Sequence, residues 1–163
     1  MIELGCGPGP NLVRIFKNFP GRQLGGVDVN PEAIELAKKT FKGGLFKVGS
    51  IEDVMMSDKS TDVVLTDMCL IYFSPSKVGK VLEEIKRVAR RHIVLCELHT
   101  TSFWRRMKIR LFEGYYMHNY KKLLESHGFY DINLIKVKKE HWPESTLQQN
   151  YSYIITALVP KRK

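Results

Sequence analysis

Two kinds of apolar pattern alternate along the chain. Short runs that are apolar throughout predict β-strands covered on both faces, and apolar residues repeated at helical spacing predict helices with one buried face. The runs place seven strands at residues 2–4, 24–29, 45–48, 62–67, 92–98, 129–137 and 151–159.

Helices are expected between most of these strands. Asn30-Pro31 and Ser74-Pro75 are residue pairs that commonly begin helices, and Gly128 suits the left-handed position after a helix ends. No helical pattern separates the last two strands, so they are expected to form a hairpin. The pattern therefore predicts an α/β protein with a doubly wound, mostly parallel seven-stranded sheet, an antiparallel C-terminal hairpin and helices on both faces.

The composition fits one soluble domain over residues 1–163, with 44% hydrophobic and 26% charged residues. No stretch reaches the about 20 consecutive apolar residues of a membrane span, and no signal peptide is recognised. Cys6, Cys69 and Cys96 are too scattered for a disulfide framework or a zinc site. Reduced thiols, a cytoplasmic protein and no bound metal are expected.

The positive charge is concentrated in the second part of the chain. Residues 1–100 hold 14 Lys and Arg against 12 Asp and Glu, whereas residues 101–163 hold 12 against five. Such a basic segment could face nucleic acid, an anionic substrate or an acidic surface, or it could simply be solvated. Charge alone does not decide among these alternatives.

The chemistry is carried first by the sequence ELGCGPG at residues 3–9. A strand that ends in closely spaced glycines and leads into a helix lets backbone amides approach a ligand without obstruction by Cβ atoms. The spacing G-x-G-x-G differs from the dinucleotide pattern G-x-G-x-x-G. Glu3 would also repel a pyrophosphate, whereas an ammonium or sulfonium ligand would tolerate it.

Asp28 is the second anchor of the expected site. It lies near the end of the second predicted strand, about twenty residues beyond the glycines, where a carboxylate can hold both hydroxyls of a ribose. In an open α/β sheet, ligands bind beyond the carboxyl ends of the strands, so both features point to the same edge.

With these motifs the chain resembles the class I S-adenosylmethionine-dependent methyltransferases. The resemblance implies S-adenosylmethionine as the cofactor, with adenine contacts after the third strand and the methyl-transfer site after the fourth. Ser50 departs from the acidic residue common at its position in that family. The cofactor residues implied are Glu3, Gly5, Cys6, Gly7, Asp28, Val29, Ser50, Ile51, Asp67 and Met68.

Two departures from the family pattern affect the expected acceptor site. The sequence begins at the first strand, without the helices that usually precede it. Two alternatives are therefore expected: a shortened version of the fold, or a lid supplied by residues 102–116 or by a partner chain. The sequence after Asp67 does not match the N/D-P-P-Y motif of amino-directed DNA methyltransferases, which argues against DNA as the substrate. Residues 102–112 could form the lid helix, or an interface helix for a membrane or RNA.

Methyl transfer chiefly requires alignment of an acceptor with the electrophilic methyl group, and a general base is needed only by some acceptors. His99 at the mouth of the fifth strand and Asp67 are the candidate catalytic residues, although packing roles are equally consistent with the sequence. A small-molecule acceptor is the main hypothesis. The alternatives are an RNA or RNA-associated acceptor, and a catalytically silent binding subunit; a homodimer is also considered.

Overall fold

The structure is a computed structural model that describes residues 1–160. Its sheet has the order β3-β2-β1-β4-β5-β7-β6, in which β1 to β5 are parallel and β7 runs antiparallel to both β5 and β6. The predicted α/β class and the antiparallel C-terminal pair are confirmed. The strands are β1 (Ile2–Leu4), β2 (Gly25–Asp28), β3 (Leu45–Val48), β4 (Thr61–Asp67), β5 (Ala89–Leu98), β6 (Tyr130–Lys136) and β7 (Ser152–Leu158).

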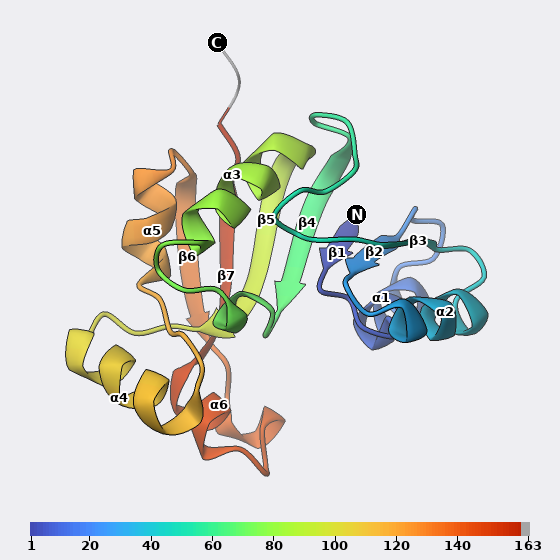
Figure 1. The fold of residues 1–163 in the computed structure, drawn as a ribbon. Helices are drawn as coiled ribbons and strands as arrows, with labels where there is room; N and C mark the ends of the chain where they lie inside the picture. The colour runs from blue at the N-terminus through green and yellow to red at the C-terminus, as the bar shows by residue number, and fades with distance from the viewer. Residues whose placement is uncertain (161–163) are drawn as a thin grey trace.

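Helices pack on both faces of the sheet (Figure 1). One apolar core joins α1 and α2 to the sheet, and a larger core joins it to α3 and α5. The α-helices are α1 (Pro10–Asn18), α2 (Pro31–Thr40), α3 (Val78–Val88), α4 (Phe103–Glu113), α5 (Tyr120–Ser126) and α6 (Thr146–Tyr151), with 3-10 turns at Leu70–Tyr72 and Lys139–His141.

The expected helix ends are confirmed at two places and wrong at one. The Asn30 side chain accepts hydrogen bonds from the amides of Glu32 and Ala33, and Gly128 has a φ of +82°. In contrast, α3 begins at Val78 rather than at Ser74. The Ser74 carbonyl accepts the amides of Lys77 and Val78, so residues 74–77 form a turn that precedes the helix.

The expectation of a helix-free connection between the last two strands is wrong. A 3-10 turn and α6 lie between β6 and β7. The helix α6 has only six residues, and of its apolar side chains Leu147 and Tyr151 are partly buried, which is too short a pattern to predict a helix from the sequence. Its first turn is instead capped locally by Ser145, whose hydroxyl accepts the amide of Gln148.

The carboxyl ends of the parallel strands meet at the lower edge of the sheet in Figure 1, to which the β4 arrow points. The glycine loop and the ends of β2 and β4 lie at this edge, and α4 and α6 lie beyond it. The fold thus gathers the predicted site residues from separate segments. Among residues 1–160, no helix has the length and apolar character needed to cross a bilayer.

Candidate functional site

The loop after β1 contains three glycines in left-handed conformations. Gly5, Gly7 and Gly9 have φ values of +74°, +50° and +80°, which side chains rarely adopt. A Cβ on Gly5 would also overlap the Cys69 side chain, whereas the space around Gly7 is open. The loop therefore packs against the segment after β4 on one side and leaves backbone accessible on the other.

Asp28 fixes this loop to the end of β2. One carboxylate oxygen accepts the Gly7 amide at 2.7 Å, and the other accepts the Asn30 amide at 2.9 Å. The carboxylate therefore joins the glycine loop to the start of α2. The structure brings the two anchors predicted from sequence into direct contact.

Asn11, which the sequence did not single out, links two carboxylates of the site. Its side-chain nitrogen donates to Glu3 Oε1 at 2.8 Å and to Asp67 Oδ2 at 3.0 Å. Since its partners lie on β1 and β4, 8 and 56 positions away, no local pattern identifies this role. Asn11 holds the ends of the two strands in a fixed relation.

The same two carboxylates present acceptor atoms without partners. Glu3 Oε2 and Asp67 Oδ1 are buried and make no hydrogen bond. Burial raises the pKa of Glu3 to about 7, the Asn11 hydrogen bond opposes this shift, and the charges of Asp67 and Asp28 add to it. Clustered, partly unsatisfied carboxylates favour a cationic group beside them, because such a group supplies both charge and donors. An ammonium group on a ligand fits these requirements.

Glu97 is a second important residue that the sequence analysis missed. Its carboxylate is fully buried at the end of β5. Its Oε1 accepts the Thr66 hydroxyl at 2.9 Å and the amides of Cys69 and Leu70 at 3.0 Å each. Burial raises the pKa of Glu97 to about 7, against the opposing effect of these hydrogen bonds. Glu97 thereby positions the segment after β4, in which Met68 has a φ of +47°.

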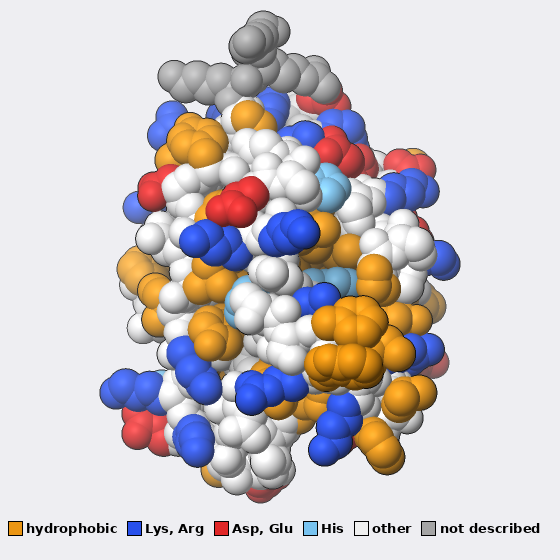
Figure 2. Space-filling model, turned by 90° about the vertical axis from the view of Figure 1, so that its left-hand side faces the viewer, with side chains coloured by type: hydrophobic (Ala, Val, Ile, Leu, Met, Phe, Trp, Pro, Cys, Tyr) orange, Lys and Arg blue, Asp and Glu red, His pale blue; other side chains and the backbone are white. Residues whose placement is uncertain are grey.

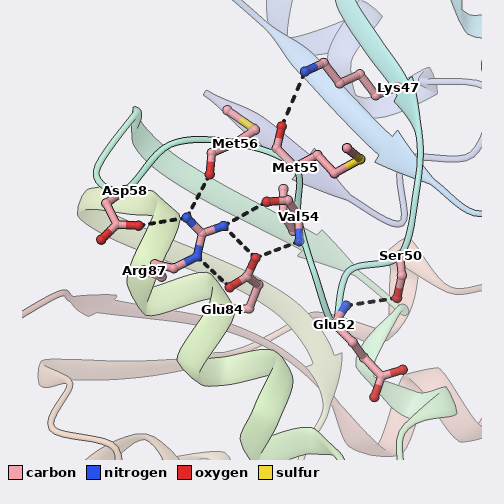
Figure 3. Close-up of polar contacts among 9 residues, drawn as sticks. All are labelled: Lys47, Ser50, Glu52, Val54, Met55, Met56, Asp58, Glu84 and Arg87. Carbon is pink, nitrogen blue, oxygen red and sulfur yellow. Dashed lines mark hydrogen bonds and ion pairs between the residues drawn. The ribbon is translucent and has the colours of Figure 1, made fainter.

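The segment after β3 is held from the side by Arg87 of α3 (Figure 3). The guanidinium donates to the carbonyls of Val54 and Met56 and pairs with Glu84 and Asp58 at 2.7 and 2.8 Å. Glu84 in turn accepts the Val54 amide at 2.6 Å. These contacts fix the chain that directly follows the predicted adenine-binding residues.

The remaining predicted cofactor residues occupy different environments. Ile51 is buried in the larger core, and the Ser50 hydroxyl accepts the Glu52 amide at 3.1 Å (Figure 3). Val29 is exposed just beyond β2, and Met68 packs against a small cluster of Ile71, Leu98 and Met117. Cys6 is buried beneath the glycine loop, and burial raises the pKa of its thiol to about 12.

His99 is buried and already engaged by the protein. Its Nδ1 accepts the Tyr120 amide at 3.2 Å at the start of α5, so the neutral ring carries its proton on Nε2. Burial and the charge of Arg106 lower the pKa of His99. Because its free lone pair is used by this contact, the geometry supports a capping role more directly than a general-base role.

The region beyond β4 and β5 is apolar and aromatic. Tyr72 and Tyr115 contact edge to face with ring centroids 5.8 Å apart, and Tyr72 is largely exposed. Beneath them, Leu147 and Tyr151 from the connection between β6 and β7 pack against the same small cluster as Met68. The site therefore has a charged side near the glycines and an aromatic side near residues 68–72.

Comparisons with known proteins agree with this arrangement. Residues 1–92 match the methyltransferase domain family. An uncharacterised methyltransferase-like protein of Schizosaccharomyces pombe is 32% identical over 90 residues, which are 55% of this chain and 34% of that protein. A demethylmenaquinone methyltransferase of Thermotoga maritima is 28% identical over 100 residues, covering 60% and 43% of the two chains. The chain thus spans less than half the length of these relatives.

The fold is also found among solved structures. The magnesium protoporphyrin IX methyltransferase of Synechocystis, solved with bound S-adenosylhomocysteine, superposes with a TM-score of 0.70 at 15% identity, covering 98% of this chain and 73% of that one. At this identity the likeness concerns the fold alone. Together with the match over residues 1–92, it shows that the chain belongs to the class I S-adenosylmethionine-dependent methyltransferases.

Proposed function

We propose that the chain transfers a methyl group from S-adenosylmethionine to a small-molecule acceptor. The observation that carries the proposal is the pair of buried, unpartnered carboxylate oxygens on Glu3 and Asp67, next to a loop of left-handed glycines. The cofactor, when bound, supplies a methyl group made electrophilic by its sulfonium. The two carboxylates would hold its ammonium group.

Other residues of the site would hold the remainder of the cofactor. Asp28 would accept the ribose hydroxyls, Val29, Ser50 and Ile51 would lie along the adenine, and Gly5, Cys6, Gly7 and Met68 would line the rest of the site. The proposal is supported by the hydrogen bond from the Gly7 amide to Asp28, since this bond holds the carboxylate beside the glycine loop. Asn11 and Glu97 then keep both strand ends in place.

A small acceptor is favoured by the aromatic side of the site. Tyr72, Tyr115 and the apolar cluster beneath them offer flat, apolar contacts, which suit a compact organic molecule. The printed names of two compared proteins, the demethylmenaquinone and magnesium protoporphyrin IX methyltransferases, also refer to small molecules. No general base is required by the proposal, and Asp67 and His99 remain candidates only for acceptors that must lose a proton.

RNA is the second candidate acceptor, supported by the basic residues of α4. The two candidates differ in their response to salt, because contacts with phosphates weaken steeply as salt is added. A Michaelis constant that is unchanged between low and moderate salt would support the small acceptor. A free-thiol state of the described cysteines supports a reducing, cytoplasmic location as part of the proposal.

The test of the cofactor site is calorimetric titration of S-adenosylmethionine and S-adenosylhomocysteine into the wild type and Asp28→Ala. We expect micromolar-range binding, weakened in the variant by about 1–3 kcal/mol through loss of charge-assisted hydrogen bonds. Asp62→Ala is the matched control, since Asp62 pairs only at the surface with Arg90. Wild-type affinity in Asp28→Ala would refute the ribose assignment.

Turnover separates an enzyme from a silent binding subunit. Release of S-adenosylhomocysteine in the presence of a panel of small acceptors is the expected result. Cofactor binding without any turnover, together with a stable protein partner, would instead support the binding subunit.

A further inference from the structure

The helix α4 is poorly attached to the rest of the molecule. It follows β5 at the carboxyl edge of the sheet, and none of its 11 residues is buried. Arg106 and Ile109 are half-buried and mark the side by which it rests on the protein. On the opposite side, Trp104 and Leu111 are largely exposed.

That outward side is strongly apolar. Trp104, Leu111 and Phe112 are 79%, 74% and 77% exposed, and Met107 lies between them. Trp104, Met107 and Leu111 share one face because they are three and four positions apart. An exposed stripe of this kind is a binding surface more often than a chance feature.

Unpaired cations flank the stripe. None of the α4 cations forms an ion pair within the described residues. Arg106 donates only to backbone carbonyls of residues 100 and 101, and the Arg110 guanidinium lies over the Tyr116 ring at 4.4 Å. The helix carries Arg105, Arg106, Lys108 and Arg110 against the single acid Glu113.

A cavity of about 580 Å³ opens beside the helix, between α4 and α5. Val78, Met117 and Leu123 contribute apolar lining, and the cations at the cavity are Arg106, Arg110 and Lys122. On this side of the molecule, hydrophobic and basic side chains lie next to each other in the lower half, where acidic side chains are few (Figure 2). The cavity is therefore lined by both apolar and positively charged side chains.

We propose that α4 and the mouth of this cavity form a docking surface for an anionic lipid bilayer. Trp104 and Leu111 enter the interface between headgroups and acyl chains, while Arg105 and Lys108 contact the phosphates. The aliphatic side chains decide between lipid and RNA. Bases stack on aromatic rings, but RNA offers little to Met107 and Leu111, whereas a bilayer buries both.

The docking surface and the cofactor site lie at the same edge of the sheet but share no residues. Since α4 follows the end of β5, the bilayer would lie on the same side of the sheet as the strand ends that form the cofactor site. The cavity lining does not include any residue assigned to the cofactor. The docking surface is thus independent of the proposed methyl transfer, and the two can be tested separately.

The test is co-sedimentation of the chain with vesicles of phosphatidylcholine alone and of phosphatidylcholine mixed with phosphatidylglycerol. We expect binding to the mixed vesicles only. Removing two charges in the double variant Arg105→Gln, Lys108→Gln should reduce partitioning roughly thirtyfold, at about one kcal/mol for each cation at an anionic surface. Leu111→Glu should abolish binding, because it places a carboxylate in the apolar interface.

Matched controls keep the result specific. Lys39→Glu on α2 lowers the net charge by two, as Arg105→Gln, Lys108→Gln does. Because it lies on another helix, this variant should bind vesicles as the wild type does. In a Trp142→Phe background, Trp104 is the only remaining tryptophan of the two in the chain, so its emission should shift to the blue with mixed vesicles. Unchanged S-adenosylmethionine affinity in the α4 variants shows that they remain folded.

Several results would overturn the docking proposal. These are absent binding to mixed vesicles, equal binding to both kinds of vesicle, and normal binding by Leu111→Glu. Salt-sensitive binding of a homopolymeric RNA without vesicle binding would assign the surface to RNA. A dimer seen by ultracentrifugation that Leu111→Glu dissociates, again without vesicle binding, would assign it to a second copy of the chain.

Discussion

At the scale of single residues, Asn11 decides whether two buried carboxylates can lie at the ends of β1 and β4. Its side-chain nitrogen donates to one oxygen of Glu3 and to one oxygen of Asp67. Without it, the carboxylates would keep their mutual repulsion and lose their shared donor. The protein can keep the two carboxylates close together because the neutral side-chain amide of Asn11 donates a hydrogen bond to each of them.

Replacing Asn11 by alanine should therefore destabilise the protein. We expect the free energy of unfolding at neutral pH to fall by about 1–3 kcal/mol, the usual range when buried polar groups lose their partner. The measurement is urea denaturation of both proteins. Asn18→Ala is the control, because the Asn18 amide donates only to an exposed backbone carbonyl, and it should change stability by less than about 0.5 kcal/mol.

Glu97 predicts a specific dependence of stability on pH. Its pKa is about 7 in the folded protein, against an ordinary value of 4.5. Stability from a raised carboxyl pKa is complete below the unfolded pKa and is lost as pH rises through the folded pKa. Between pH 6 and 8, titration of Glu97 should lower the free energy of unfolding by roughly 1 kcal/mol, and titration of Glu3, whose pKa is raised to the same value, by a similar amount.

The variant Glu97→Gln isolates this effect. Its side-chain oxygen can still accept from Thr66, Cys69 and Leu70, while the titration is gone. His99 and His118, whose pKa values burial lowers, act with the opposite sign but equally in both proteins. Unfolding curves at pH 6 and 8 should show that the variant loses roughly 1 kcal/mol less stability than the wild type. Parallel losses in both proteins would contradict this account of Glu97.

The sequence indicated only part of this residue-level arrangement. Glu3, Gly5, Gly7, Asp28 and Asp67 come together at one edge, as the ends of parallel strands must. Asn11 and Glu97 were missed because their roles depend on partners brought near only by the fold. His99 was placed correctly at the end of β5, but its contact with the Tyr120 amide could not be read from the sequence.

At the scale of elements, the segment between β3 and β4 is ordered without a helix of its own. Arg87 on α3 holds this segment in place, because its guanidinium donates to two backbone carbonyls of the segment and pairs with Asp58. One side chain thus connects α3 to the segment that follows the predicted adenine site. Elements that the sequence defines by their apolar faces were found, whereas α6, with no buried residue, was not.

Loss of this link should loosen the segment. Arg87→Ala is expected to lower the free energy of unfolding by about 1–3 kcal/mol, because charge-assisted hydrogen bonds to Glu84 and to the backbone are removed together. Amide hydrogen exchange should accelerate most at residues 54–58. Arg90→Ala is the matched control, since its ion pair with Asp62 is exposed and such pairs contribute about 0–1 kcal/mol. Similar losses in both variants would show that Arg87 acts only as a surface charge.

At the scale of the whole molecule, the charged side of the site lies within the family match, whereas the aromatic side combines Tyr72 with residues beyond that match. The family match covers residues 1–92, which include the glycine loop, Asp28 and Asp67. The aromatic side draws on Tyr115, Leu147 and Tyr151 from beyond that match. Cofactor binding is therefore expected to depend on the matched residues, while acceptor choice is expected to depend also on residues beyond the match.

This division predicts that cofactor and acceptor binding can be changed separately. Tyr72→Ala removes the ring that contacts Tyr115 at the exposed edge of the aromatic side. The Michaelis constant of this variant for the acceptor should therefore rise about two- to tenfold, as for loss of an aromatic contact worth about 0.5–1.5 kcal/mol. Its affinity for S-adenosylmethionine should stay unchanged. Asp28→Ala should have the opposite effect. It should lower the affinity for S-adenosylmethionine and leave the Michaelis constant for the acceptor, measured at saturating cofactor, unchanged. If Tyr72→Ala weakened the binding of both ligands equally, the two sides would form one cooperative site, and the binding of cofactor and acceptor could not be changed separately.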